Sequence, residues 1–463
     1  MQYQGPSLEK INSVRSSAGV YRNLQDGFFR LFPLTSNNAR LEIVPGCFLR
    51  KAGGKIVSES ESEADKLASQ IYEFVEQDTP AGSLELVKRT LYEICEAASS
   101  RETNDLRIAL ASKGDAGADK VAWYLVSMAG DADRLREIVQ KAIGDAGKSA
   151  NVIERLVACV VPIEDSAEKE STPYFNVNRS LSVRFLEDLE WVLSSEKAIG
   201  EYLSNILEFY CFMFIAQSCL TVERRLEGER EVAPLYFALD WEKTTQSRRC
   251  YKQGFKKLEP AIENMFVHAG ILEILNTNDS GEQYDYIAIN RAIEDNPAIE
   301  PEIAAAIRSV TETCRMQARE QKSVELFSDI ELPSESPFCL KDEIDYLYKT
   351  IRAILFNTDR NQARNRYSNA FRIFCQGGLR FEKVRGRSGT MLNLTEETLL
   401  LLTAVSVGNK ESLSLVELFR SFETRGVFLD EPSREAVAEF YDRRNMLDKK
   451  SDSGETQYVK RIL

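Results

Sequence analysis

Histidine is the side chain most often used for acid–base catalysis near neutral pH, and this chain of 463 residues contains one, His268. It lies in the helix-patterned segment 261–271, with no Ser, Cys or Asp partner in a recognisable catalytic motif. Zinc hydrolases with two His ligands and histidine-dependent phosphohydrolases need more than one imidazole. We therefore interpret His268 as a structural residue.

Three short segments carry fragments of catalytic motifs. Residues 142–149 (AIGDAGKS) end as a phosphate-binding loop ends, but Ala142 replaces the first required glycine and the preceding residues are helix-patterned. Asp448-Lys449-Lys450 has the D-x-K letters of many nuclease sites without a second acid on a preceding strand, and Asp240–Glu242 has no better context. The sequence therefore predicts no catalytic residue, no metal site and no cofactor, and we expect a protein that is not an enzyme.

Charge is unevenly distributed along the chain, whose formal net charge is −13. Residues 341–463 carry 21 Lys and Arg against 18 Asp and Glu, so the preceding residues are strongly acidic. The positive density is highest between residues 351 and 390, with nine basic side chains and two acidic ones. This distribution excludes a general polycation but favours a nucleic-acid or acidic-protein contact in the C-terminal part.

The hydrophobic pattern predicts a mainly α protein with a multi-domain helical body. Residues up to about 55 are expected to be irregular and β-containing, and helical rhythms follow over 61–161, 181–274 and 299–322. Proline-bearing polar stretches at 162–178 and 328–337 predict boundaries. We expect a β-containing then helical domain at 1–165, a central helical domain at 166–335 and a basic C-terminal domain at 338–463.

Several features predict a cytoplasmic protein that does not enter membranes. The nine cysteines include no C-x-x-C pair, and most lie in apolar helical patterns typical of buried, reduced thiols. The most apolar run, 209–220, is too short for a span and is expected to form a buried helix. Residues 1–10 show no signal-peptide pattern.

The C-terminal domain has the pattern of a long helix over 342–375, an extended basic segment over 379–394, three short helices and a hairpin. Thr395, Ser414 with Glu417, and Asp430 with Pro432 are start signals for the three short helices. The hairpin is expected around the turn 451–454, between Leu447 and Val459. Three helices followed by a hairpin indicate a winged-helix-like module.

Basic side chains of this domain are the candidate DNA contacts, because Lys and Arg bind phosphates. The predicted set comprises Arg364, Arg366, Arg385, Arg387, Arg434, Arg443, Arg444, Lys449 and Lys450. Acidic residues at 431, 435 and 439 on the third short helix oppose a phosphate contact, so docking of another protein by this module stays equally open. The basic pairs at 224–225, 248–249 and 256–257 are either partner-facing patches or, as is more common, solvated helix faces.

Three C-terminal segments resemble the G component of bacterial DNA phosphorothioation-dependent restriction systems. They are residues 394–407 (LTEETLLLLTAVSV), 423–430 (ETRGVFLD) and 445–463 (NMLDKKSDSGETQYVKRIL), and the resemblance covers about the last 70 residues. It implies a bacterial defence role in a complex that acts on DNA lacking a sulfur mark. It also implies partner subunits of the F and H types, which have ATPase or helicase motifs.

The preferred hypothesis is therefore a non-catalytic adaptor or scaffold subunit of such a restriction complex. Its acidic helical body would contact the partner ATPase subunits, and its basic C-terminal part would contact DNA or a DNA-handling ATPase. A stand-alone winged-helix DNA-binding regulator is the alternative. A nuclease with an unrecognised site is a third possibility, for which the sequence offers the least support.

Overall fold

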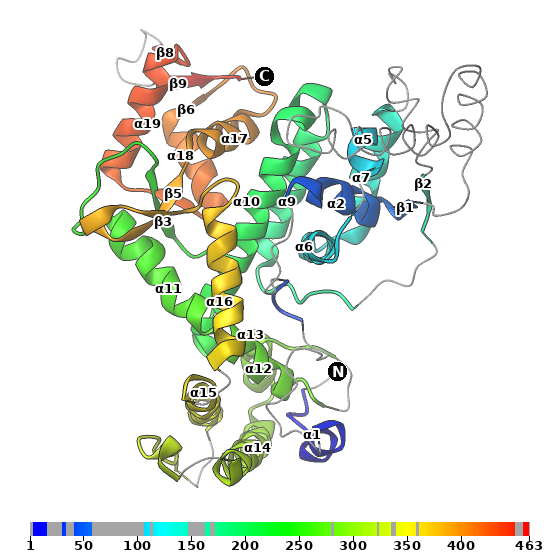
Figure 1. The fold of residues 1–463 in the computed structure, drawn as a ribbon, viewed down its shortest axis with the longest axis vertical. Helices are drawn as coiled ribbons and strands as arrows, with labels where there is room; N and C mark the ends of the chain where they lie inside the picture. Colours follow the sequence, from blue (N-terminus) through cyan, green and yellow to red (C-terminus); the bar gives the residue numbers. More distant parts are fainter. Residues whose placement is uncertain are drawn as a thin grey trace, which may run out of the picture.

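The computed structural model describes residues 3–15, 30–33, 41–57, 106–111, 114–146, 163–166, 172–278, 282–321, 324–334, 339–357, 361–449 and 457–462. Over these ranges the protein is mainly helical, as the sequence predicts, and its strands are short. The long helix α10 (Glu196–Glu223) lies at the centre of the view in Figure 1. Helices packed against it include α2 (Val44–Gly53), α6 (Ala116–Met128), α9 (Arg179–Val192), α11 (Lys256–Glu263) and α17 (Glu396–Val407).

Helix α10 forms the centre of the hydrophobic core. It begins at Ser195, whose hydroxyl accepts a hydrogen bond from the Ala198 backbone N–H at 3.2 Å. Every residue from Asn205 to Val222 is buried, which is typical of a helix that is apolar all round. By length and composition α10 could cross a membrane, but its apolar window is entirely inside the protein. It is thus packed like the core helix of a soluble protein, as predicted for 209–220.

The N-terminal part is more helical than its sequence pattern indicates. Residues 41–49, expected to be β-containing, form the 3-10 turn η1 (Leu41–Ile43) and most of α2. Pro45 lies in the first turn of α2, where a missing N–H costs nothing, and Gly54 ends the helix at φ 66°. The pair Pro45-Gly46 therefore starts a helix instead of marking a turn between strands. The other N-terminal elements are α1 (Leu8–Arg15), β1 (Lys55–Val57) with its antiparallel partner β2 (Ile163–Asp165), α5 (Leu106–Ala111) and α7 (Ala132–Ala146).

A lower group of helices continues from the end of α11 (Figure 1). It comprises α12 (Met265–Leu275), α13 (Tyr286–Asp295), α14 (Glu300–Gln321), α15 (Leu340–Phe356) and α16 (Asn361–Gln376), with the short turns η2 (Arg225–Glu227), η4 (Pro297–Ile299) and η5 (Val324–Phe327) nearby. The long helix predicted over 342–375 is therefore two helices. In Figure 1 α15 is seen nearly end-on, whereas α16 is seen from the side and runs vertically. The N-terminal α1 lies beside α14, and the Tyr3 hydroxyl donates to the Leu275 carbonyl at 2.9 Å.

A four-stranded mixed sheet joins the central and C-terminal parts. Its strand order is β4-β5-β3-β7, with β3 parallel to both neighbours and β4 antiparallel to β5. The strands are β3 (Leu235–Leu239), β4 (Glu382–Val384), β5 (Thr390–Leu394) and β7 (Val427–Leu429), with the turn η6 (Gly386–Ser388) between β4 and β5. The extended segment predicted over 379–394 is confirmed. The helical prediction for 181–274 is wrong around β3, where Pro234 and Asp240 bound a short apolar run typical of a buried strand.

The chain ends in three helices and a three-stranded antiparallel sheet of order β6-β9-β8. The elements are α17, β6 (Ser412–Ser414), α18 (Leu415–Thr424), α19 (Glu431–Arg443), β8 (Leu447–Lys449) and β9 (Gln457–Lys460). The predicted caps are present: Thr395 and Asp430 cap α17 and α19, and Ser414 forms a capping box with Glu417. Leu447 pairs with Val459 as expected, while the turn 451–454 lies outside the described residues.

The proposed boundary near residue 335 is crossed by the sheet, because β3 precedes it and β4, β5 and β7 follow it. The buried ion pair between Arg425 and Asp188 crosses it as well. The C-terminal elements are therefore built onto the central helices through shared hydrogen bonds and a shared core. Residues 335–338 themselves lie outside the described part of the chain.

Candidate nucleic-acid interface

The mixed sheet has two faces with different coverings, because side chains alternate along β3. Leu235, Phe237 and Leu239 belong to the main core. On the other face Ala238 packs with Cys250 and Met391, bordered by Tyr236 and Tyr251. The segment between β3 and α11, residues 240–255, therefore covers the outer face of the sheet and ends in the π-helical turn η3 (Tyr251–Phe255).

Arg248 fixes this covering segment to the start of α19. Its guanidinium hydrogen-bonds both carboxylate oxygens of Asp430, a carboxylate oxygen of Glu242 and the Ser433 hydroxyl, the last at 2.9 Å. Burial tends to raise the pKa of the Asp430 carboxyl, but hydrogen bonding and the charge of Arg248 hold that pKa below its ordinary value. All three charged side chains are mostly buried, so Arg248 is an internal anchor and not part of a binding surface.

Arg385 is a second internal anchor, although its sequence position suggested a DNA contact. It donates to the carbonyls of Leu239 and Glu242, each at 2.7 Å, and to the Asn393 side-chain oxygen at 3.0 Å. Burial lowers the pKa of the Arg385 guanidinium. Its donors thus hold the turn after β3 instead of facing solvent, and we do not include Arg385 in the candidate interface.

Arg387 lies two residues after Arg385, but its side chain is exposed to solvent and not held against the turn after β3. Its carbonyl accepts a hydrogen bond from the Gln246 side chain at 3.0 Å. The neighbouring Ser388 hydroxyl donates to the Thr244 carbonyl at 2.9 Å. Gly389, at φ 81°, completes the turn, and a Cβ there would lie 3.0 Å from the Tyr251 ring. The β4–β5 turn is therefore docked on segment 240–255 and carries Arg387 outward beside it.

Residues 243–257 contain six cationic side chains and no acidic one. With Arg248 turned inward, the exposed cations of this stretch join Arg387 on the surface of the covering segment. We call this surface the cationic face and define it by Lys243, Arg249, Lys252, Lys256 and Arg387, all of which are exposed. The sequence pattern points to Arg387 and to the pairs 248–249 and 256–257 separately, but it does not connect them.

Two tyrosines support the cationic face from beneath. The Arg249 guanidinium lies over the Tyr236 ring at 5.7 Å and donates to its hydroxyl at 3.2 Å. The Lys256 ammonium lies over the Tyr251 ring at 5.4 Å. These contacts orient the two cations without neutralising them. Two of the five cations of the face are therefore held by contacts with aromatic rings, and the exposed positive charge suits a row of phosphates.

The predicted arginines of α19 are arranged differently. Arg434 pairs with Glu423 at 2.6 Å and lies over the Phe419 ring at 5.2 Å. Arg443 pairs with Glu439 at 2.8 Å, and Arg444 pairs with Glu396. The exposed side chains of α19 include Glu431, Glu435, Glu439 and Asp442. This helix therefore presents mixed charge with an acidic excess, which repels a phosphate backbone.

The remaining predicted contacts fall where side chains are not described. Arg364 and Arg366 lie in α16 and Lys449 lies in β8, while Lys450 is outside the described residues altogether.

Asp448, the acid of the D-x-K segment, pairs with Lys460 at 2.9 Å. Residues 142–146 are helical within α7, and 147–149 lie outside the described part. Among the described residues no group of three or more His, Cys, Asp or Glu side chains could hold a metal ion.

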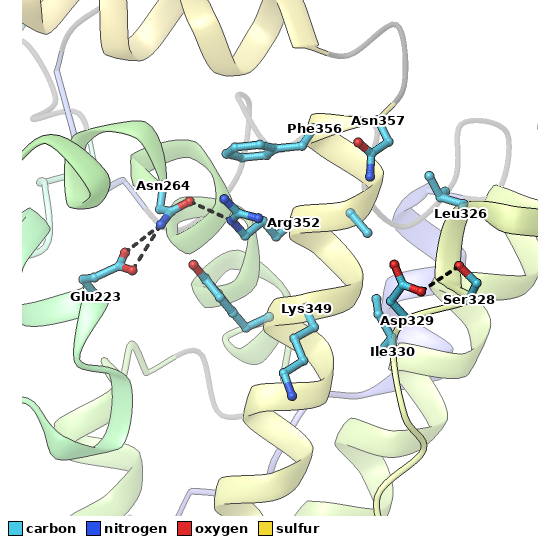
Figure 2. A pocket seen from close by; sticks show the side chains of 12 residues that line it. Glu223, Asn264, Leu326, Ser328, Asp329, Ile330, Lys349, Arg352, Phe356 and Asn357 are labelled. Carbon is cyan, nitrogen blue, oxygen red and sulfur yellow. Dashed lines mark hydrogen bonds between the residues drawn. The ribbon is translucent and has the colours of Figure 1, made fainter.

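A polar cavity of about 850 Å³ lies in the lower part of the protein, where Glu223, Asn264 and Arg352 are among its lining residues. Figure 2 shows Asn264 between the other two side chains, donating to Glu223 and accepting from Arg352. His268 is fully buried behind this wall, 3.0 Å from Glu223 and 3.1 Å from the Tyr286 hydroxyl. Burial lowers the pKa of His268. Each ring nitrogen lies within hydrogen-bond distance of a neighbouring side chain. This arrangement is typical of a structural histidine.

No protein-family model and no curated protein matches this chain.

Proposed function

We propose that this protein is a non-catalytic adaptor subunit that contacts DNA through the cationic face. The supporting observation is that Arg249, Lys252, Lys256 and Arg387 lie on or beside a covering segment that Arg248 fixes to the start of α19 and Arg385 fixes to the β4–β5 turn. A fixed surface of exposed cations binds phosphates with little loss of conformational freedom. Of the predicted DNA contacts, this proposal keeps Arg387 and leaves out Arg385 and the arginines of α19.

The proposed setting is a cytoplasmic DNA phosphorothioation-dependent restriction complex, with F and H type ATPase or helicase components as partners. Support for this part comes from the resemblance of residues 394–407, 423–430 and 445–463 to the G component of such systems. The order of helices and strands from α17 to β9 also suits the winged-helix-like module expected there. With its acidic exposed side chains, α19 is better suited to a protein partner than to a DNA groove. We therefore favour the adaptor over a stand-alone regulator.

Charge reversal tests the DNA contact. We expect full-length protein with Arg249→Glu, Lys252→Glu, Lys256→Glu and Arg387→Glu to bind duplex DNA much more weakly. The slope of log affinity against log salt should fall by roughly 3 to 4, at about 0.9 for each phosphate that is no longer neutralised. A control with Lys120→Glu, Lys141→Glu, Lys197→Glu and Lys410→Glu has the same net charge but changes exposed side chains elsewhere. It should keep the original slope.

Two results would contradict the DNA contact. Equal weakening in both variants would show that binding follows net charge alone, and unchanged binding in the first variant would place the DNA elsewhere. The adaptor role is tested separately by co-expression with F and H type components. Failure of the full-length protein to co-purify with either component would overturn that role, whatever the DNA result.

A further inference from the structure

Trp241 is a large aromatic side chain left partly in solvent at the edge of the cationic face. It lies two residues after the end of β3 and is 44% exposed. One side of the indole stacks on Phe440 of α19, with ring centroids 5.1 Å apart and planes inclined by 26°. The Arg444 guanidinium lies over the same Phe440 ring at 4.9 Å. Arg444, Phe440 and Trp241 thus form a stack that ends in a solvent-accessible indole.

The backbone that carries Trp241 is held on both sides. The Glu242 N–H donates to the Leu239 carbonyl at 3.1 Å, which closes a tight turn around the indole. Arg385 donates to the carbonyls of the same two residues, and the Glu242 side chain accepts from the Leu239 N–H at 3.0 Å. A rigid turn keeps the ring in place before any ligand arrives. An exposed indole on an anchored turn can stack on a flat ligand with little further loss of conformational freedom.

We propose that Trp241 is a stacking platform for an unpaired nucleobase of a DNA strand bound on the cationic face. An aromatic ring beside a row of cations is the arrangement by which proteins hold single strands, the ring taking a base and the cations the phosphates. Lys243 lies two residues from Trp241, and the turn carrying Arg387 is hydrogen-bonded to Thr244 and Gln246. Trp241 therefore lies on the same covering segment that carries Lys243 and holds the turn of Arg387. This inference rests on the proposed function and adds that the DNA is at least locally single-stranded.

The test compares two single-stranded oligonucleotides of equal length, one of thymidines and one containing abasic sites. Both carry the same phosphates, so their difference in affinity reports the bases alone. We expect full-length protein to prefer the thymidine strand by about fivefold to a hundredfold, as for one stacked base. Trp241→Ala should remove this preference while keeping the affinity for the abasic strand. Trp241→Phe should keep most of the preference.

Indole fluorescence supplies an independent readout. The thymidine strand should quench the fluorescence of the natural protein and of a Trp191→Phe control, but not that of Trp241→Phe. An unchanged preference in Trp241→Ala would overturn the platform while leaving the cationic face intact. Normal DNA binding by Trp241→Ala combined with loss of a partner subunit would instead assign Trp241 to a protein contact. Failure of both strands to bind the natural protein would overturn this inference, and failure of duplex DNA to bind as well would overturn the proposed function itself.

Discussion

Arg425 and Asp188 form a buried ion pair between the C-terminal part of the chain and helix α9. The two side chains are 5% and 3% exposed, and the Arg425 Nε lies 2.6 Å from an Asp188 carboxylate oxygen. The Tyr210 hydroxyl, from α10, donates to the same oxygen at 2.6 Å. Burial opposes the charged form of Arg425, but the Asp188 carboxylate raises the pKa of the guanidinium above its ordinary value. This ion pair thus fixes the C-terminal elements to the helical body. Removing either side chain would leave the other charge buried without a partner and lower the stability of the fold.

Replacing Arg425 with Met should destabilise the protein by about 3–5 kcal/mol, because it leaves the Asp188 carboxylate buried without a counter-charge. Denaturant unfolding of the full-length protein measures this change. The double variant Arg425→Met with Asp188→Asn removes both charges and keeps an acceptor for Tyr210, so it should be clearly more stable than the single variant. Equal destabilisation of the two variants would rule out the unpaired charge as the cause.

Gly378 should not tolerate a side chain. A Cβ at this position would lie 1.8 Å from a carboxylate oxygen of Glu208, and its φ is 37°. That same oxygen accepts the Leu379 backbone N–H at 2.5 Å, so Glu208 cannot move aside without losing a buried hydrogen bond. We expect Gly378→Ala to cost about 1–3 kcal/mol or more. The neighbouring Gly377 has no atom closer than 3.6 Å to its Cβ position, so Gly377→Ala should have little effect in the same unfolding assay.

Helix starts and ends in the C-terminal part could be predicted because their signals are local. Thr395, Ser414 and Asp430 each cap a helix through a backbone N–H only a few residues away. The mixed sheet could not be predicted in this way, because the partners of β3 lie more than 150 residues further along the chain. The pattern of β3 is local, but its parallel pairing depends on how α10, α16 and α17 pack.

In the candidate interface, too, some features follow from local sequence and others depend on packing. Arg385 and Arg387 occupy one turn and are indistinguishable as sequence candidates. Their different orientations follow from packing, because the carbonyls of Leu239 and Glu242 lie within reach of Arg385 alone. One sequence signal was available: the run 243–257 has six cations and no acid directly after an apolar strand. Its junction with the turn of Arg387 required the three-dimensional structure.

The two arginines should therefore respond differently to removal. Arg385→Ala removes a donor from the Glu242 carbonyl, from the Asn393 amide oxygen and from the Leu239 carbonyl, which keeps the Glu242 N–H, and this should lower stability by about 1–3 kcal/mol. Arg387→Ala should leave the melting temperature nearly unchanged but reduce the salt slope of DNA binding by about 0.9. Thermal melting and binding at several salt concentrations separate these effects. A variant of Arg387 that melts early, or one of Arg385 that melts normally, would contradict the assigned roles.

His268 should make stability depend on pH in a definite direction. The pKa of the folded imidazole is lowered from 6.5, because burial disfavours its charged form. Below that value the unfolded chain binds a proton that the folded protein does not, so stability should fall as pH decreases from about 7. The loss from this one group is at most about 1.4 kcal/mol per pH unit. Because His268 is the only histidine in the chain, its contribution can be isolated.

The variant His268→Gln isolates that contribution, because its amide can bond Glu223 and Tyr286 without titrating. Chemical unfolding between about pH 5 and 7.5 should show a steep rise of stability with pH in the natural protein and a flatter curve in the variant. Burial raises the pKa of Glu382, so this carboxyl acts in the opposite sense and lowers stability as pH rises. Identical slopes in the two proteins would assign the dependence to other groups. A slope that reverses sign only in the variant would reveal the Glu382 contribution directly.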